Sequence, residues 1–252
     1  MTADSQPTLL VTGGGRGIGA ATARLAAARG YAVCVNYLSD EDAARSVVDG
    51  IKGAGGNAMA VRADISSETE VVTLFDTAER ALGPLRGLVN NAGILSQQMC
   101  LADMEVERLE RVFAVNVIGA LVCAREAVRR MAITRGGAGG GIVNVSSAAA
   151  RLGGAGEYVD YAASKGAMDT LTIGLAKEVA AEGIRVNAVR PGLIHTDIHA
   201  SGGEAGRVQR LQGQVPMRRG GLPEEVAQAI VWLLSDDASY CTGSLVDVAG
   251  GR

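Results

Sequence analysis

Two side chains with complementary acid–base chemistry stand four residues apart in Tyr161-Ala-Ala-Ser-Lys165. If this segment is helical, the phenol and the ammonium lie on one face, about 6 Å apart along the axis. A nearby cation favours the phenolate, so we expect the pKa of Tyr161 to fall from about 10 towards working pH. Tyr161 could then act as a general acid or base. The alternative is that Tyr161 and Lys165 are surface residues of an exposed helix with no catalytic role. Tyr158, which Ala162 follows at the same spacing, lacks a lysine partner and is expected to pack or to line the rim of a substrate site.

A glycine-rich turn, Thr12-Gly-Gly-Gly-Arg-Gly-Ile-Gly19, separates the apolar run Leu9–Val11 from an alanine-rich segment of helical character. Glycines between a strand and a helix let backbone N–H groups approach a pyrophosphate, which the positive end of the helix dipole also attracts. No Gly-Lys-Ser/Thr follows, so the turn is not a P-loop. A purely structural turn is the alternative for a glycine cluster alone. Its position directly after the first strand favours nucleotide binding.

Short β-rich apolar runs alternate with segments of helical periodicity along the whole chain. This order predicts an α/β fold over residues 1–252: a single-domain, Rossmann-type doubly wound parallel sheet of about seven strands with helices on both faces. The strands are expected at 8–12, 32–37, 57–62, 86–90, 141–146, 184–190 and 244–248, and the helices at 17–29, 41–53, 67–82, 104–134, 160–181 and 223–234. The segment 104–134 is expected to divide into two helices, and Gly136–Gly141 to form a flexible surface turn.

The spacing Thr-Gly-x-x-x-Gly-x-Gly resembles the glycine turn of the short-chain dehydrogenase/reductase family. Further motifs that resemble those of the family follow in its order: Asn90-Asn-Ala-Gly93, Asn116 between two valines, Ser146-Ser147, Tyr161-x-x-x-Lys165 and Pro191-Gly192. The resemblance spans essentially the whole chain. It implies hydride transfer between C4 of a nicotinamide and a carbonyl or carbinol carbon.

The resemblance implies a catalytic tetrad of Asn116, Ser147, Tyr161 and Lys165. Tyr161 would exchange a proton with the substrate oxygen, and Ser147 would hydrogen-bond that oxygen. Lys165 would lower the pKa of Tyr161 and hold the nicotinamide ribose, while Asn116 would support a water chain that relays protons. Ser147 and Tyr161 are 14 residues apart, one more than in many family members, so Ser146 stays an alternative to Ser147.

The resemblance also implies a cofactor site. Its expected residues are Gly13, Gly15, Arg16, Gly17, Ile18, Gly19, Asn36, Tyr37, Asp64, Ile65, Asn90, Ala92, Gly93, Tyr161, Lys165, Pro191, Gly192, Ile194 and Thr196. We expect NADP(H) to be preferred over NAD(H), because Tyr37 stands where NAD-specific relatives carry an aspartate that repels a 2′-phosphate. Arg16 offers a planar donor fork and Asn36 a neutral hydrogen bond. A site that accepts NAD(H) as well is the alternative, and the acidic run 40–42 would weaken the preference if it folded back.

The resemblance implies an NADP(H)-dependent oxidoreductase of secondary alcohols or ketones. The nearest resemblances are to 3-oxoacyl thioester reductases and glucose-type sugar dehydrogenases, with a glycine-rich substrate lid near 195–215. A non-catalytic NAD(P)-binding regulatory protein on the same fold is the alternative, since a fold alone does not fix a function. No metal site is expected. His195 and His199 have the spacing of zinc ligands on a helix, but the glutamate of H-E-x-x-H is missing.

Composition narrows the range of partners. The formal net charge of −3 lacks the basic excess of a nucleic-acid-binding surface. No apolar run approaches the roughly 20 residues of a membrane span. The four cysteines form no C-x-x-C pair, and the N-terminus has an acid where a signal peptide needs basic charge, so a cytoplasmic protein is expected. The family resemblance implies a homotetramer acting on a small molecule, assembled through helices in 104–134 and 160–181 and the C-terminal strand.

Overall fold

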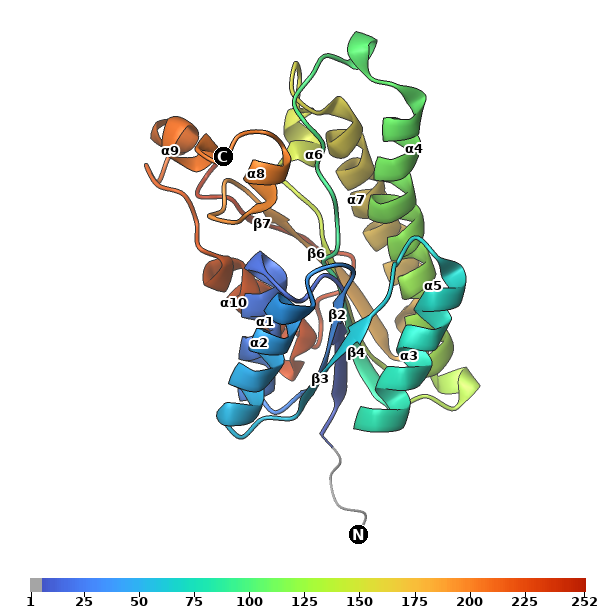
Figure 1. Cartoon of the computed structure of the whole chain (residues 1–252). Helices are drawn as coiled ribbons and strands as arrows, with labels where there is room; N and C mark the ends of the chain where they lie inside the picture. The colour runs from blue at the N-terminus through green and yellow to red at the C-terminus, as the bar shows by residue number, and fades with distance from the viewer. Residues whose placement is uncertain (1–5) are drawn as a thin grey trace.

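A parallel sheet of seven strands runs through residues 6–252, the part of the chain that the computed structural model describes (Figure 1). The strand order β3-β2-β1-β4-β5-β6-β7 confirms the expected doubly wound sheet. The N-terminal start, where no export signal is expected, falls largely on residues 1–5 and so outside the described residues. The strands are β1 (Thr8–Val11), β2 (Ala32–Tyr37), β3 (Ala58–Arg62), β4 (Leu85–Asn90), β5 (Gly140–Val145), β6 (Ile184–Pro191) and β7 (Leu245–Val248).

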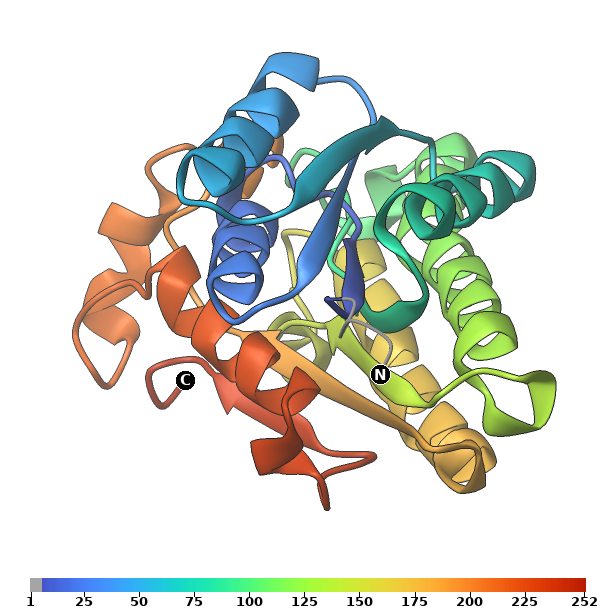
Figure 2. The ribbon, with the colours of Figure 1, turned by 90° about the horizontal axis from the view of Figure 1, so that it is seen from below.

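Helices cover both faces of the sheet (Figure 2). The α-helices are α1 (Gly17–Ala28), α2 (Glu41–Gly53), α3 (Glu68–Leu82), α4 (Val106–Phe113), α5 (Ala120–Met131), α6 (Ala149–Leu152), α7 (Val159–Val179), α8 (Ile198–Ser201), α9 (Arg207–Leu211) and α10 (Pro223–Leu234). Helices α1, α2 and α10 form one layer, and α3, α4, α5 and α7 form the other. Among the described residues, none of these helices has both the length and the apolar character to cross a bilayer.

The alternation of side chains along the buried strands explains the two layers. In β1, Leu9 and Val11 pack in the core under α1, α2 and α10, whereas Leu10 packs in the core under α3, α5 and α7. In β2, Cys34 likewise faces the opposite side from Val33. A strand buried on both faces needs apolar residues on both, which is why Leu9–Val11 is a continuous apolar run rather than an alternating one.

The helix limits follow from local chemistry. The Asp40 carboxylate caps α2 by accepting a hydrogen bond from the backbone N of Ala43. Helix α10 starts with Pro223, and Glu225 accepts a hydrogen bond from the backbone N of Leu222. The predicted limits agree with the observed ones within two residues, except in 104–134. There a π-helical segment, Ala114–Gly119, joins α4 to α5, so the two expected helices are continuous with each other.

The run Gly136–Gly141 is not the free surface turn expected from its composition. A Cβ atom on Gly139, which has a φ of +70°, would lie 2.4 Å from the carbonyl oxygen of Gly183. Gly141 is buried and belongs to β5, where it pairs with Arg185 of β6. Its glycines allow backbone segments to pack closely, a use that composition does not distinguish from flexibility.

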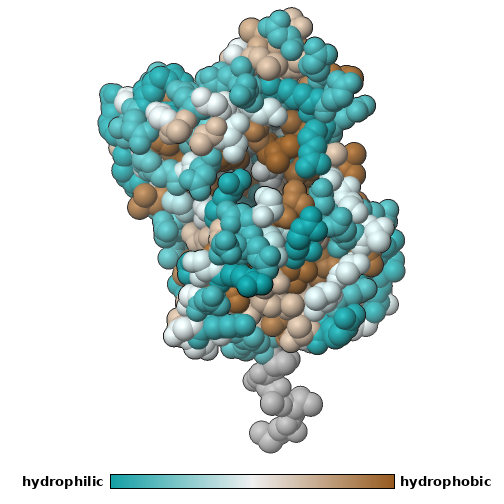
Figure 3. All heavy atoms as spheres, viewed as in Figure 1, coloured by the Kyte–Doolittle hydropathy of each residue, from teal (hydrophilic) through white to brown (hydrophobic). Residues whose placement is uncertain are grey.

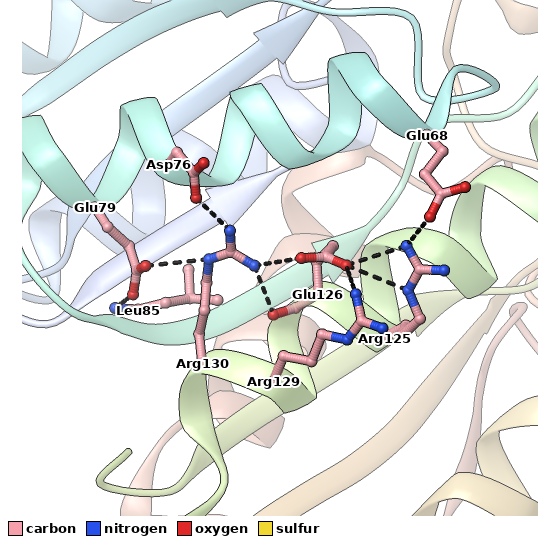
Figure 4. Close-up of polar contacts among 8 residues, drawn as sticks. All are labelled: Glu68, Asp76, Glu79, Leu85, Arg125, Glu126, Arg129 and Arg130. Carbon is pink, nitrogen blue, oxygen red and sulfur yellow. Dashed lines mark hydrogen bonds and ion pairs between the residues drawn. The ribbon is translucent and has the colours of Figure 1, made fainter. Parts of the chain in front are cut away.

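An ionic network joins α5 to α3 (Figure 4). Its centre is Glu126, whose side chain is only 4% exposed and accepts hydrogen bonds from Arg125, Arg129 and Arg130. Arg125 also binds the exposed Glu68 of α3, while Arg130 reaches Asp76 and Glu79 of the same helix. Burial alone would raise the pKa of Glu126, but the hydrogen bonds and charges of the arginines hold it below its usual value.

Replacing Glu126 by glutamine should lower the free energy of unfolding by about 3 kcal/mol at pH 7, because three guanidinium groups lose a buried carboxylate. Urea denaturation measures this change. The pKa of Glu126 is lower in the folded state than its value of about 4.3 in the unfolded chain, so the carboxylate stabilises the fold at any pH above that value. That stabilisation is lost as the pH falls through the folded-state pKa. The difference between the wild type and Glu126→Gln should therefore shrink in acid.

The matched control is Glu68→Gln in the same network. Its side chain is 63% exposed, so its loss should cost at most about 1 kcal/mol. Equal costs for the two variants would contradict the central role of Glu126.

Candidate active site

A cavity of about 510 Å³ opens at the carboxyl ends of the central strands. Its walls include the glycine turn after β1, the segment after β4, the serines after β5 and the segment after β6. Figure 3 shows the molecule hollowed near the centre of this face, with hydrophobic residues beside the opening. Ligands of open α/β sheets bind at this edge, where the crossovers on either side of β1 and β4 diverge.

The glycine turn is fastened to the end of β4. The Thr12 hydroxyl accepts hydrogen bonds of 3.0 Å from the backbone N of Asn91 and of Ala92. In return the Asn91 amide donates to the carbonyl oxygens of Thr12 and Gly13, at 2.9 and 3.0 Å. Gly13 has a φ of +60°, and a Cβ there would lie 3.0 Å from the Ala92 backbone. The turn is thus a fixed cradle rather than a loose loop.

The predicted acid–base pair lies on the opposite wall of the same cavity. Helix α7 carries Tyr161 and Lys165 one turn apart, with the lysine Nζ 5.6 Å from the centroid of the tyrosine ring. Ser147 is near enough to the Tyr161 phenol to lower its pKa. The buried Lys165 ammonium donates to the carbonyl oxygen of Val145 at 2.8 Å. Tyr161, Ser147 and Lys165 all line the cavity, so the structure brings three of the four predicted catalytic residues together.

Ser146 and Ser147 face different surroundings. The Ser146 hydroxyl is buried and donates to the carbonyl oxygen of Lys165 at 3.1 Å, inside the fold. Both serines line the cavity, but Ser147 is the one that lowers the pKa of Tyr161. The chain between Ser147 and Tyr161 forms α6 and then a turn in which Gly153, Gly154 and Gly156 all have positive φ. That turn accommodates the 14-residue spacing, and the geometry favours Ser147 over Ser146.

The protonation states differ from the expectation based on helical spacing. Burial raises the pKa of Tyr161 above its usual value, and the Ser147 hydrogen bond only partly opposes this. Burial also lowers the pKa of Lys165 to about 8, with Asp169 acting in the opposite direction. The predicted fall in the tyrosine pKa is therefore wrong for the protein alone. Both groups are desolvated, which disfavours the phenolate and the ammonium alike, and the ammonium is directed at Val145 rather than at the phenol oxygen.

Asn116 lies behind the cavity wall rather than in it. It belongs to the π-helical segment, where its Oδ1 accepts from the backbone N of Ile94 at 2.8 Å and its Nδ2 donates to the Ile94 carbonyl and to Ser164. A Cβ on Gly93 would lie 3.4 Å from Asn116 Oδ1 and 3.5 Å from Lys165 Nζ. Asn116 thus holds the segment after β4 against α7.

Comparisons with known proteins agree with this geometry. The family model described as enoyl-(acyl carrier protein) reductase matches residues 13–252. An uncharacterized oxidoreductase, YgfF of Escherichia coli, is 60% identical, covering 96% of this chain and 98% of its own length. A 3beta-hydroxysteroid dehydrogenase of Eggerthella lenta is 42% identical, covering 97% and 92%. A short chain dehydrogenase from Burkholderia cenocepacia, solved in complex with NADP, matches with a TM-score of 0.89, 32% identity and coverage of 99% of both chains.

The chain belongs to the short-chain dehydrogenase/reductase family. As a member, it is an oxidoreductase that acts on alcohol or ketone substrates with a nicotinamide cofactor.

Most of the predicted cofactor residues of this short-chain dehydrogenase/reductase line the cavity. They are Gly13, Gly15, Arg16, Gly17, Ile18, Asn36, Tyr37, Asp64, Ile65, Ala92, Gly93, Tyr161, Lys165, Pro191, Gly192, Ile194 and Thr196. The segment after β6 closes over the glycine turn, since a Cβ on Gly17 would lie 3.1 Å from Thr196 Cγ2.

Three predicted cofactor contacts need correction. Gly19 does not line the cavity; a Cβ there would lie 2.4 Å from the carbonyl oxygen of Gly13, so it is needed for packing inside the turn. Asn90 is turned away into the sheet and donates to Asn144 and to the Ala120 carbonyl. Asn36 borders the cavity, but its amide donates to the Ala63 carbonyl and its Oδ1 accepts from the backbone N of Gly13. It supports the turn and has no free donor for a phosphate.

One of the two histidines has a hydrogen-bond partner inside the fold. His199 places Nε2 2.9 Å from the carbonyl oxygen of Ile194, and burial lowers its pKa below the usual value. In residues 6–252, no three His, Cys, Asp or Glu side chains come close enough together to hold a metal ion.

Sequence reasoning missed several residues of the site. Asn91, beside the predicted Asn90, fastens the turn, and only the strand register decides which of the two faces β1. Ser39 lines the cavity just beyond β2, a position that the motif search could have included. Glu157 and Arg207 also line it, and their mutual hydrogen bonds hold the pKa of Glu157 below its usual value. No sequence signal joins these two, because they are 50 residues apart.

The two serines provide a direct test of this geometry. Ser147→Ala should lower kcat by about 100-fold, as expected for the loss of a hydroxyl that binds the substrate oxygen. Ser146→Ala should change kcat by a few fold at most and lower stability by about 1 kcal/mol, because only an internal hydrogen bond is lost. Steady-state kinetics with a ketone panel and thermal unfolding of both variants measure these effects. A larger kcat loss in Ser146→Ala would reverse the assignment.

Proposed function

We propose that this short-chain dehydrogenase/reductase interconverts ketones and secondary alcohols with NADP(H), and that Tyr161, Ser147, Lys165 and Asn116 carry the reaction. The observation that supports this most directly is the grouping of Tyr161, Ser147 and the buried Lys165 in the same cavity as the glycine turn, with the lysine Nζ 5.6 Å from the Tyr161 ring centroid.

The cavity fits a dinucleotide in its shape and donors. Backbone N–H groups of the glycine turn, at the start of α1, suit the pyrophosphate. The space beside Gly93, which a Cβ would narrow next to Lys165, suits the nicotinamide ribose, with Lys165 as donor to its hydroxyls. When bound, NADPH supplies the hydride.

The chain's own residues handle the proton. The raised pKa of Tyr161 keeps the phenol protonated at neutral pH, which suits donation of its proton to a ketone oxygen. Ser147 hydrogen-bonds that oxygen and orients it. Lys165, with a pKa of about 8, is cationic at neutral pH and stabilises the phenolate that forms. Asn116 positions the Ile94 segment against α7, and the proton-relaying water chain remains a prediction of the family resemblance.

The substrate end of the cavity favours the 3-oxoacyl thioester class over the sugar class. Its walls carry the aliphatic Leu95, Leu152, Leu193 and Ile198. Two of the charged groups that line the cavity, Glu157 and Arg207, are hydrogen-bonded to each other rather than free for sugar hydroxyls. We therefore propose a neutral ketone with an apolar chain next to the carbonyl, with glucose-type sugars as the second class to test.

Preference for NADP(H) is the finer part of the cofactor proposal. Arg16 lines the adenosine end of the cavity, and its guanidinium makes no hydrogen bond or ion pair with the described residues. Tyr37 and Ser39 line the same end without adding an acid. Asp40 lines it too, and its carboxylate caps α2 but keeps the negative charge that opposes a 2′-phosphate. The Arg16 guanidinium and the neutral Tyr37 and Ser39 support a 2′-phosphate site, with NAD(H) as the weaker cofactor.

Tyr161→Phe should lower kcat by at least about 1,000-fold and leave the Kd of NADPH within a few fold, because it removes the transferable proton and little else. Tyr158→Phe should cost only a few fold. The measurements are ketone-dependent NADPH oxidation and NADPH fluorescence titration. The opposite order of effects would refute the assignment. Binding of NADPH without oxidation over the whole carbonyl panel would favour a non-catalytic regulator.

The cofactor proposal predicts that kcat/KM favours NADPH over NADH, and that Arg16→Ala reduces this ratio by about 10-fold or more through the loss of a charged phosphate contact. Parallel kinetics with the two cofactors measure it. A wild-type preference for NADH, or a ratio that Arg16→Ala leaves unchanged, would overturn the assignment.

A cytoplasmic homotetramer is the proposed assembly, acting on a small molecule and not on nucleic acid or membranes. Exposed apolar side chains on the outer layer, among them Phe113, Ile118, Leu121 and Ile173, support association through α4, α5 and α7. Light scattering should give four times the chain mass at micromolar concentration. A monomer would contradict the proposal.

A further inference from the structure

Arg207 is the first residue of α9, a short helix of the segment expected to form the substrate lid. Although this segment lies at the surface, the Arg207 side chain is only 7% exposed. Its NH1 and NH2 groups donate to the two carboxylate oxygens of Glu157, at 2.9 and 2.6 Å, and NH1 also reaches Glu204 at 3.2 Å. A bidentate pair of this kind fixes geometry as well as charge. It therefore joins α9 to the turn that precedes α7.

The same guanidinium lies over an aromatic ring of the candidate active site. The Arg207 Cζ is 5.0 Å from the centroid of the Tyr158 ring, a cation–π arrangement. Tyr158 in turn meets the Tyr161 ring edge to face, with the centroids 5.9 Å apart and the planes at 84°. Arg207, Tyr158 and Tyr161 thus form a continuous series of contacts from the lid segment to Tyr161, the proposed proton donor.

These contacts indicate that Arg207 does more than hold α9 against the rest of the protein. Val208 and Leu211 of α9 already pack with Leu193 and Val215 in a small apolar cluster. Burying a guanidinium has a desolvation cost that a second apolar contact would avoid. Direct capture of a substrate anion is also disfavoured, because Glu157 and Glu204 occupy the NH1 and NH2 donors. What the arginine adds is a fixed orientation for the Tyr158 ring.

We propose that Arg207 is a positioning residue for the reduction: with α9 in place, the Glu157-bound guanidinium fixes Tyr158, and Tyr158 holds the Tyr161 ring in its productive orientation. This inference rests on the proposed role of Tyr161 as the proton donor.

The test compares Arg207→Met with Arg210→Met. Arg210 lies on the same helix, binds the same Glu204 and comes within 4.0 Å of Glu157, but its side chain is 53% exposed. Arg207→Met should lower kcat for the ketone by about 10- to 100-fold, because a misplaced proton donor costs rate. The KM of NADPH should stay within twofold. Arg207→Lys should recover part of the loss, whereas Arg210→Met should stay within twofold of the wild type. Equal effects of the two methionine variants would overturn the proposal.

A double-mutant cycle separates positioning of Tyr161 from a general structural role. In a Tyr161→Phe background, Arg207→Met should cause no further loss of the residual turnover, because the group that it positions is gone. Multiplicative losses would show that Arg207 acts by another route and would refute the proposal. A Tyr161→Phe enzyme that keeps full activity would instead refute the proposed function of Tyr161.

Hydrogen exchange followed by mass spectrometry tests the link without turnover. In the protein without ketone, Arg207→Met and Tyr158→Leu should each speed exchange in peptides covering both 204–215 and 157–165. Arg210→Met should leave exchange in 157–165 unchanged. Faster exchange in 204–215 alone after Arg207→Met would show that α9 and the Tyr161 turn are independent. That result would overturn the inference even if Tyr161 is the proton donor.

Discussion

The divergence of the chain on either side of β1 and β4 is the constraint on which the rest of this structure depends. A parallel sheet that is wound in both directions from its centre must leave an opening at the carboxyl ends of those two strands. The Thr12 hydroxyl and the Asn91 amide join the two strands across that opening with hydrogen bonds of 2.9 to 3.0 Å. The glycine turn can therefore be open to a pyrophosphate and still be rigid.

Desolvation sets the chemistry of the opposite wall. Tyr161 and Lys165 are both held out of water, so the phenol keeps its proton and the ammonium is easier to deprotonate than a free lysine. A hydrogen bond to the Val145 carbonyl fixes Lys165, and Ser147 lowers the pKa of Tyr161. Such a pair suits delivery of a proton to a ketone oxygen, which is the direction that our proposal favours. Membership of the family establishes the class of reaction, whereas the choice of substrate depends on cavity side chains outside the family motifs.

Charged side chains connect neighbouring segments in two different ways. Around Glu126, three arginines surround one buried carboxylate between α5 and α3, far from the cavity, and the role of this network is structural. At Arg207 the arrangement is inverted, because one buried guanidinium is held between Glu157 and Glu204 over an aromatic ring in the cavity wall. Because Arg207 contacts Tyr161 through Tyr158, we propose a functional role for it.

The amino-acid sequence alone predicted the fold class, the seven strands, the limits of the longer helices outside 104–134, the glycine turn and the pairing of Tyr161 with Lys165, but not the short helices α6, α8 and α9. These features depend on local periodicity and on residues close together in the chain, so they can be read from spacing. The tertiary structure placed Asn91 rather than Asn90 in the cavity wall, and it gave the Ser146 hydroxyl an internal partner, the Lys165 carbonyl, although both serines line the cavity. It also decided that the glycines of 136–141 serve close packing, that burial raises the tyrosine pKa, and that Arg207 meets Tyr158. Strand register, desolvation and contacts between residues 50 positions apart are properties of the packed chain, and no local pattern in the sequence encodes them.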